Sequence, residues 1–311
     1  MRSRTIIYLE VLFAVIAWGA SFVATKVALR DVQPFTVVWL RFAMGIAVLG
    51  LVVIRRSQWA LPARRELLAF AGIGFLGITL HQWLQSTALV SAQATTTAWI
   101  VSTSPVFIAI LGALALRERL RPAQVAGIAL AMTGVLLLVS RGDLRALFAG
   151  GAWTFGDVLI MISAVNWAVF SVLSRGLMLR HPPARALLFV MGLGWLFTTI
   201  LFLPSSGLGD IAHLTRPGWM GILFLGIGCS GLAYIAWYDA LQVLPVSQVG
   251  VFLYLEPLVT VVVAWWVLAE PVTLVALAGG GIILLGVWLV NRAPARQPAG
   301  AHGGKPPEAN A

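Results

Sequence analysis

Ten apolar stretches, each long enough to cross a membrane, constrain the fold of this chain more than any other feature of its sequence. About 20 apolar residues suffice for one transmembrane helix. The stretches cover residues 6–29, 35–54, 67–89, 93–116, 122–140, 155–174, 186–203, 218–241, 246–268 and 272–291. Charged residues make up only 10% of the chain, whereas soluble domains contain about 25%. The sequence therefore predicts an all-α, polytopic membrane protein with ten transmembrane helices.

The basic residues predict how these helices are oriented. The formal charge is +10, but the basic residues lie in short loops between the apolar stretches, so we expect no nucleic-acid partner. With ten helices, fifteen basic residues fall on one side of the lipid bilayer and five on the other. Lysine and arginine are enriched in cytoplasmic loops. We therefore expect a multi-pass protein of the inner (plasma) membrane with both termini in the cytoplasm.

An internal repeat divides the chain into two halves. A shift of 152 residues places 104–139 over 256–291 without a gap, so that Pro105 falls on Pro257 and Glu118 on Glu270. We expect a five-helix repeat at 1–140, a loop at 141–153, a second five-helix repeat at 154–292 and a disordered cytoplasmic tail at 293–311. An odd number of helices per repeat inverts the second one in the membrane. Inverted repeats are typical of transporters with a binding site at the midplane.

Two glycine hexads, at 72–77 and 226–231, have the spacing of a dinucleotide-binding turn. That turn requires a preceding strand and an acidic residue about twenty positions later, and the first copy has no acid between Glu66 and Glu118. Both hexads fall in the third helix of their repeat. Small residues let helix backbones approach closely in lipid, so we interpret the hexads as packing sites.

Motifs in both halves form one combined pattern. They are Pro105, Glu118, Leu120, Gln124, Gly127 and Gly134-Val135, the segment AWGASFVATK at 17–26, Pro34 with Arg41, and the segment 156–175. This pattern resembles the EamA module of the drug/metabolite transporter superfamily over residues 6–291. The resemblance implies a ten-helix permease that moves small organic solutes such as amino acids, usually outward. The halves are not equivalent, because Val190 fills the place of Arg41 and Pro271 follows Glu270 where Arg119 follows Glu118.

Polar and aromatic side chains on the third and eighth helices mark a candidate substrate-binding cavity. Polar groups inside a membrane helix face the bundle interior or a water-filled cavity. The repeat places Gln82 and Gln85 over Tyr234 and Trp237, and equivalent positions in inverted halves point to one shared axis. Interhelical hydrogen bonding with aromatic packing is the alternative. The candidates on these two helices are His81, Gln82, Gln85, Tyr234, Trp237 and Tyr238.

Other helices contribute further candidates for the same cavity. The first helix carries Trp18 and Ser21, and the sixth, its repeat partner, carries Asn166 and Trp167. Trp99 on the fourth helix and Tyr254 on the ninth complete the set. Trp99 lies nearer a helix end than the other tryptophans, so an interfacial anchor and a pocket residue both remain open for it.

The fourth and ninth helices each contain a helix-breaking proline, Pro105 and Pro257. Proline removes a backbone donor and frees carbonyls within the span. Glu256 precedes Pro257 near the middle of its helix, where a carboxyl is costly. We predict that Glu256 is a coupling or recognition carboxylate that binds a proton or a substrate ammonium. A protonated acid with a purely structural hydrogen bond is the alternative.

The remaining charged residues within or beside the helices have simpler interpretations. Asp157 is expected to cap the sixth helix, and Asp239 to be solvated or paired with a basic loop residue. Glu118 and Glu270 act either as structural caps or as gating ion pairs. Arg41 lies about two turns from a helix end and is expected to snorkel towards the interface.

We expect no enzymatic activity, no cofactor and no metal site. The sequence lacks an HExxH pair and its four histidines are dispersed; it also lacks a glycine-rich loop ending in Lys-Ser or Lys-Thr. The prediction is a secondary active transporter, an exporter of small organic metabolites such as amino acids. It works by alternating access around a central cavity, with protons as the candidate coupling ion. A membrane channel or facilitator for small polar solutes is the alternative, and the sequence does not fix the oligomeric state.

Overall fold

The computed structural model describes residues 3–116, 120–143, 145, 153–178, 180–205 and 207–292. Within these residues, ten helical spans are long and apolar enough to cross a membrane, which confirms the number that the sequence predicts. The described part contains no β-strand, so the fold is all-α. The expected tail at 293–311, most of the expected loop at 141–153, and Glu118 lie outside the described residues.

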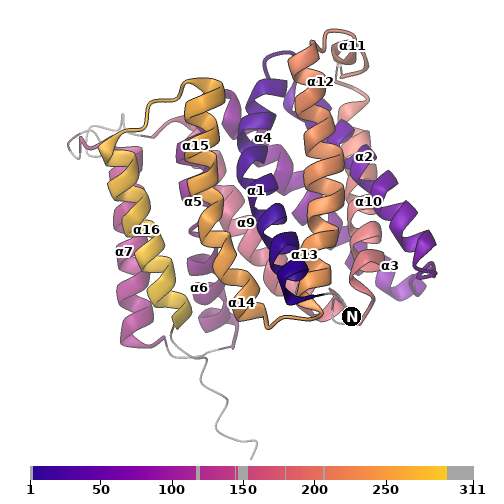
Figure 1. The fold of residues 1–311 in the computed structure, drawn as a ribbon, viewed down its shortest axis with the longest axis horizontal. Coiled ribbons are helices and arrows are strands. Elements are labelled where there is room, and N and C mark those ends of the chain that lie inside the picture. Colours follow the sequence, from indigo (N-terminus) through magenta and orange to yellow (C-terminus); the bar gives the residue numbers. More distant parts are fainter. Residues whose placement is uncertain are drawn as a thin grey trace, which may run out of the picture.

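The first half supplies five spans, of which two are interrupted (Figure 1). The third span changes from α-helix to π-helix and back, and the fourth is broken before Pro105. In order, the elements are α1 (Arg4–Ala28), α2 (Pro34–Arg55), α3 (Arg64–Gly74), η1 (Phe75–Leu80), α4 (His81–Ser91), α5 (Ala94–Val101), α6 (Ser104–Leu116) and α7 (Pro122–Val139).

The second half repeats this plan with the membrane direction inverted. Its eighth span contains a longer π-helix, η2, and its ninth is broken by a short 3₁₀ turn, η3. The elements are α9 (Phe155–Met178), α10 (Pro183–Phe202), α11 (Gly207–Ile211), α12 (Arg216–Leu223), η2 (Phe224–Ala233), α13 (Tyr234–Leu241), α14 (Val246–Val251), η3 (Phe252–Leu255), α15 (Glu256–Leu268) and α16 (Leu274–Arg292).

Asp157 caps the start of α9, as its sequence position predicts. The backbone N–H of Asp157 donates to Thr154 Oγ1 at 3.1 Å, and the backbone N–H of Thr154 donates back to Asp157 Oδ2 at 2.9 Å. This reciprocal pair satisfies two donors that a helix start leaves without partners.

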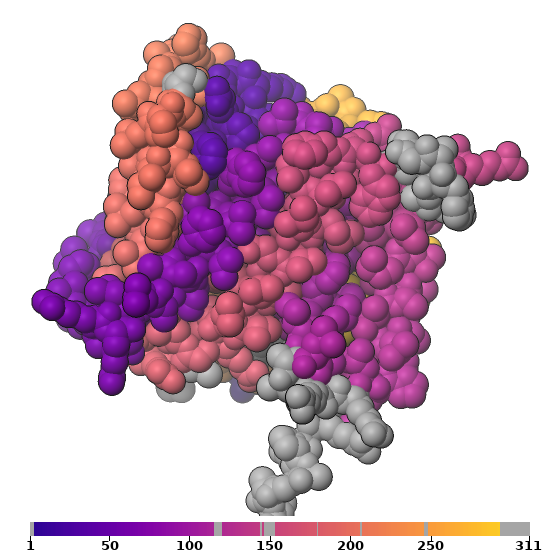
Figure 2. All heavy atoms as spheres, turned by 180° about the vertical axis from the view of Figure 1, so that it is seen from behind, coloured from indigo at the N-terminus to yellow at the C-terminus, as the bar shows by residue number. Residues whose placement is uncertain are grey.

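The two halves interlock instead of lying side by side. α1 and α2 of the first half pack along η2, while α9 and α10 of the second half pack along η1 and its flanking helices. In Figure 2 the violet segment of the third span accordingly lies beside the pink segments of the second half. The two last helices, α7 and α16, pair at one edge of the bundle (Figure 1). Each half therefore holds the third span of the other.

Glycines sit where these helices approach most closely, which confirms the packing interpretation for Gly74, Gly77, Gly226 and Gly231 but not for Gly72, which has nothing within 4 Å. A Cβ added at Gly74 would lie 2.5 Å from the Val190 carbonyl oxygen. At the equivalent place in the second half, a Cβ at Gly226 would lie 3.2 Å from the Arg41 carbonyl oxygen and still nearer to Met44. Gly74 packs against Val190 as Gly226 packs against Arg41, so equivalent positions of the inverted repeat make equivalent contacts.

Candidate functional site

The two π-helical segments, η1 and η2, are held by the first helix of the opposite half. A π turn bonds residue i to i+5 and often marks a functional position, and its carbonyls are displaced from the α-helical ladder. Asn166 Nδ2 of α9 donates to the Leu76 carbonyl in η1 at 2.8 Å. Trp18 Nε1 of α1 donates to the Cys229 carbonyl in η2 at 3.3 Å. Trp18 and Asn166 thus make equivalent contacts in the two halves.

On the α4 side, His81 and Trp167, two of the predicted cavity residues, contact each other. His81 is 4% exposed, its Nδ1 lies 2.9 Å from Ser163 Oγ, and its ring lies 4.7 Å from the Trp167 ring. Trp167 also packs against Phe170, with 4.8 Å between ring centroids. His81 and Trp167 therefore join α4 to α9, and the ring nitrogen Nδ1 already has a partner.

On the α13 side, the structure gathers an aromatic group around Trp18. The Trp18 ring lies 5.2 Å from the Tyr234 ring and 5.2 Å from the Trp237 ring. Ser21, one turn along α1, donates its hydroxyl to the Trp18 carbonyl at 2.6 Å. Tyr234, Trp237 and the adjacent Tyr238 are all half-buried. The first and eighth spans therefore form one aromatic surface from opposite halves.

Arg41 is a functional candidate that sequence reasoning missed. It does not snorkel: the side chain is 6% exposed and turns into the bundle. Its Nη1 donates to Gln82 Oε1 at 2.8 Å and its Nε to Ser230 Oγ at 3.1 Å. The guanidinium carbon lies 5.2 Å from the Phe42 ring centroid. The signal available in the sequence was the repeat itself, which places Arg41 opposite an apolar Val190.

Four of the predicted residues carry amide, hydroxyl or carboxyl groups to which no described residue offers a hydrogen bond, and the indole N–H groups of Trp99, Trp167 and Trp237 lack one as well. All four side chains are half-buried, and they come from the third, eighth and ninth spans. Buried polar groups are nearly always paired with protein, water or ligand. These four groups are therefore available to water or to a solute. They are the amide of Gln85, the hydroxyls of Tyr234 and Tyr238, and the carboxyl of Glu256.

Both helix-breaking prolines lie at the break of their span. α6 begins one residue before Pro105. At this break, the hydroxyls of Ser102, Thr103 and Ser104 donate hydrogen bonds to backbone carbonyls of the last turn of α5. α15 begins at Glu256, and Thr260 Oγ1 donates to the Glu256 carbonyl at 3.0 Å. In the first half, the Ser104 hydroxyl thus donates to the carbonyl of Val101, four residues before Pro105. In the second half, the backbone N–H of Glu256 donates to the carbonyl of Leu253, four residues before Pro257.

Trp99 and Tyr254 lie away from the aromatic group around Trp18. Trp99 is 1% exposed and packs directly against Gly280 of α16. The Tyr254 hydroxyl accepts from Asn291 Nδ2, also in α16, at 2.9 Å. The structure therefore places both side chains towards the α7–α16 edge of the bundle.

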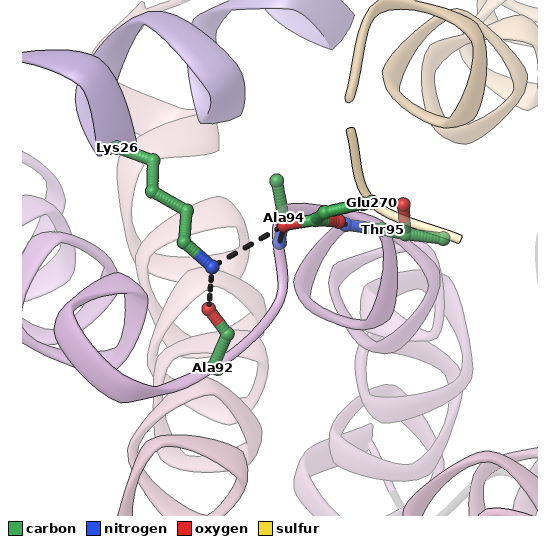
Figure 3. A network of polar contacts seen from close by, with 5 residues as sticks. All are labelled: Lys26, Ala92, Ala94, Thr95 and Glu270. Atoms are coloured by element: carbon green, nitrogen blue, oxygen red, sulfur yellow. Dashed lines mark hydrogen bonds and ion pairs between the residues drawn. The ribbon is translucent and has the colours of Figure 1, made fainter. Parts of the chain in front are cut away.

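At one end of the bundle, an ion pair between described residues joins the two halves (Figure 3). Glu270 accepts from the backbone N–H groups of Ala94 and Thr95, at 2.8 and 3.1 Å, and so caps α5. Lys26 of α1 lies 3.2 Å from Glu270 Oε1 and donates to the Ala92 carbonyl at 2.6 Å. Glu270 is thus both a cap and a member of an ion pair. We call this group the α5 latch.

A cavity of about 380 Å³ opens beside the α5 latch. It lies at the ends of the helices and is lined by both members of the ion pair. The lining residues are Lys26, Leu29, Arg30, Leu89, Val90, Gln93, Leu268, Ala269, Glu270 and Pro271. None of the midspan candidates on α4 and α13 lines this cavity.

The opposite end of the bundle has its own contact between the halves. Arg56, just beyond α2, donates to both carboxylate oxygens of Asp239 in α13, at 2.7 and 2.6 Å. These hydrogen bonds raise the pKa of the Arg56 guanidinium above its ordinary value, more than its partial burial lowers it. The pairing of Asp239 with a basic loop residue confirms one of the two interpretations drawn from the sequence.

Two inverted five-helix repeats that interlock around half-buried polar groups define a multi-pass membrane protein of the transporter class. The chain belongs to the EamA-like transporter family, whose pattern matches residues 5–140 and 154–292. Membership of this family implies a small-molecule substrate that crosses a lipid bilayer, and a transporter instead of an enzyme.

Individual proteins extend this likeness over nearly the whole chain. An uncharacterized transporter of Archaeoglobus fulgidus is 31% identical over 289 residues, which cover 93% of this chain and 98% of that protein. A protein of Streptantibioticus cattleyicolor named probable terminal-alkyne amino-acid exporter is 29% identical and covers 89% of this chain and 91% of its own length. A solved crystal structure, 23% identical, shares the fold with a TM-score of 0.61 over 93% of this chain and 99% of its own.

Proposed function

We propose that this protein is a secondary active transporter that exports small organic metabolites such as amino acids by alternating access. The observation that carries the proposal is the set of unpaired, half-buried polar groups of Gln85, Tyr234, Tyr238 and Glu256. They occupy the interior faces of an inverted-repeat protein, where transporters of this architecture bind their substrate. In the proposal, residues 1–140 and 154–292 rock against each other around these groups.

The chemistry of the site favours a solute with both polar and apolar parts. Trp18 and Trp237 offer aromatic surface beside Tyr234, and Gln85 and the tyrosine hydroxyls offer neutral hydrogen bonds. The similarity to a protein named as an amino-acid exporter supports an amino acid as the substrate class. Gln82, His81, Ser21, Asn166 and Trp167 hold the surrounding helices in place in this scheme.

Glu256 supplies the proposed coupling or recognition step. No described residue hydrogen-bonds its carboxyl, so a structural hydrogen bond does not account for an acid at this depth, where a charged side chain costs about 2.5–3.5 kcal/mol on insertion scales. A proton or a substrate ammonium bound during the cycle gives the carboxyl a partner. We propose protons as the coupling ion on this basis.

The ends of the helices are the proposed gates. The α5 latch joins α1 to the α15–α16 connection, and the Arg56–Asp239 pair joins α2 to α13 at the other end. Both contacts cross between the halves, so a rocking motion must break one of them. The excess of basic residues on one side supports an inner-membrane protein with both termini in the cytoplasm.

Counterflow in proteoliposomes tests the transport proposal. Vesicles loaded with one unlabelled L-amino acid should transiently concentrate the same radiolabelled amino acid, and protein-free vesicles should not. Labelled flux that unlabelled solute on the far side does not accelerate would instead identify a channel or facilitator. For orientation, single cysteines at Ser57 and Asp143 in a Cys229→Ala background should be labelled from opposite faces. Labelling of both from outside contradicts the proposed topology.

A further inference from the structure

Arg41 is a buried cation to which the proposed transport mechanism assigns no role. Its side chain is 6% exposed in the second span. An arginine has five N–H donors, and the structure gives it two hydrogen bonds, both to neutral oxygens of Gln82 and Ser230. No described carboxylate lies within ion-pair distance of it. Arginine within a membrane span is costly unless it is paired, so a missing anion is the simplest partner.

Helix packing does not require an arginine at this position. The inverted repeat places Val190 of α10 where α2 has Arg41, and both backbones make the same close contact with a glycine of the opposite half, Gly74 or Gly226. In the second half the residue at this place is Val190, whose carbonyl oxygen makes the contact with Gly74 and whose apolar side chain is buried, 1% exposed. The charge on Arg41 is therefore an addition to the shared architecture, confined to one side of the pseudo-two-fold axis.

The surroundings of Arg41 place it at the aromatic group around Trp18. Gln82 follows η1, and Ser230 lies within η2, four residues before Tyr234. Glu256 reaches the same group from α15: a Cβ added at Gly19, next to Trp18, would lie 2.6 Å from the Glu256 carbonyl oxygen, and the Trp18 ring lies 5.2 Å from the Tyr234 ring. Arg41 of the first half and Glu256 of the second half thus both adjoin the aromatic group around Trp18.

We propose that Arg41 binds the carboxylate of the transported solute, and that Glu256 of α15, beside the same aromatic group, binds its ammonium. The site then selects zwitterionic amino acids over amines, amides and uncharged solutes. The guanidinium fork matches a carboxylate in geometry and can donate two parallel hydrogen bonds. Gln82 and Ser230 hold the guanidinium in place, and Trp18 and Trp237 contact the side chain of the amino acid.

This inference rests on the proposed transport function, so its test uses matched solutes. Counterflow identifies the preferred L-amino acid within a panel that also contains amines and uncharged sugars. Competition by that amino acid is then compared with competition by its α-amide, which keeps the ammonium but lacks the carboxylate; for L-leucine the amide is L-leucinamide. Wild type should favour the acid over the amide. In Arg41→Gln the half-saturation concentration for the acid should rise about tenfold or more, while that for the amide stays constant.

Two further variants separate recognition from folding. Arg41→Lys keeps the charge without the fork and should retain part of the preference for the acid. Arg55→Gln removes an exposed charge from the same helix and should leave the preference unchanged. Quenching of tryptophan fluorescence in detergent gives the same acid-to-amide ratio for a variant that folds but does not transport.

The outcomes distinguish the two proposals. An unchanged acid-to-amide ratio in folded Arg41→Gln, with amino-acid counterflow intact, overturns the role of Arg41 and leaves the transport function standing. Exchange of amines or sugars by wild type, without exchange or binding of any amino acid, overturns the amino-acid proposal and the carboxylate site together. Loss of the preference only in the Arg41 variants supports both.

Discussion

The third span, in the first half, and the eighth span, its equivalent in the second half, share a π-helical segment but differ in the side chains that follow it. Each contains a π segment whose carbonyl is bonded by the first helix of the other half, through Asn166 in one case and Trp18 in the other. The residues that follow differ. His81 after η1 has a partner in Ser163, whereas the hydroxyl of Tyr234 after η2 has none among the described residues.

This difference separates what the repeat shares from what each half adds. The interlocked backbones need glycines and π segments in both halves, because both third spans cross close neighbours. The polar chemistry differs between equivalent positions of the halves, because Arg41 stands opposite Val190 and Tyr234 opposite Gln82. An inverted repeat can therefore keep a symmetric scaffold and still offer different chemical groups to the two ends of an asymmetric solute.

The largest expected effect comes from breaking the shared scaffold. Gly74→Val and Gly226→Val each force a branched side chain against a facing backbone or side chain, and overpacking costs about 1–3 kcal/mol or more. Both variants should lose folded protein to a similar degree, measured as the melting temperature by fluorescence-detected gel filtration. Gly72→Ala, where nothing lies within 4 Å, is the control. A large loss in only one half would contradict the equivalence of the two crossings.

The next effect tests the asymmetric chemistry at Glu256. Glu256→Gln keeps size and hydrogen bonding but removes titration. If the carboxyl carries the proton, the variant should still exchange solute by counterflow and lose accumulation driven by a pH gradient. If it binds an ammonium, exchange should fail as well. Asp143→Asn, in the exposed segment after α7, is the control, because among the described residues the Asp143 carboxylate accepts only from the nearby backbone N–H of Arg145. Normal gradient-driven accumulation at every pH would leave Glu256 without a role in coupling.

The smallest effect compares His81 with Tyr234 directly. Tyr234→Phe removes a hydroxyl that has no described protein partner, so stability should hold while the KM for the solute rises about threefold to tenfold, the equivalent of one hydrogen bond of about 1 kcal/mol. His81→Phe removes the bond to Ser163 and should lower the melting temperature with little change in KM. Transport assays and thermal melts of the same preparations check both. Equal increases in KM for the two variants would contradict this difference and would mean that His81 and Tyr234 both contact the solute.

Much of the fold followed from local sequence properties. Length and hydropathy determine the number of spans, because each apolar stretch either reaches across the hydrocarbon core or does not. The 152-residue repeat predicted the inverted halves, and the position of Asp157 at the start of the sixth helix predicted a helix cap. The glycine hexads predicted close helix approach, since small residues have few other uses in lipid.

The positions of side chains between helices did not follow from the sequence. Tyr254 was predicted as a cavity residue and Trp99 as either a cavity residue or an interfacial anchor, but helical rotation turns both towards α16. Arg41 read as a snorkelling residue, because its distance from the helix end permits it, and packing instead turns it inward. A periodic pattern defines which residues share a face, whereas only the neighbouring helices define what that face meets.

The sequence alone therefore determined a ten-span, all-α membrane protein with two inverted repeats, because hydrophobic length and internal similarity are properties of the chain itself. Only the tertiary structure decided that the halves interlock, that η1 and η2 are bonded across the axis, and that Arg41 reaches Gln82 and Ser230. Those contacts join residues between 41 and 211 positions apart. Their geometry depends on helix rotation and crossing, which no local pattern in a single sequence encodes.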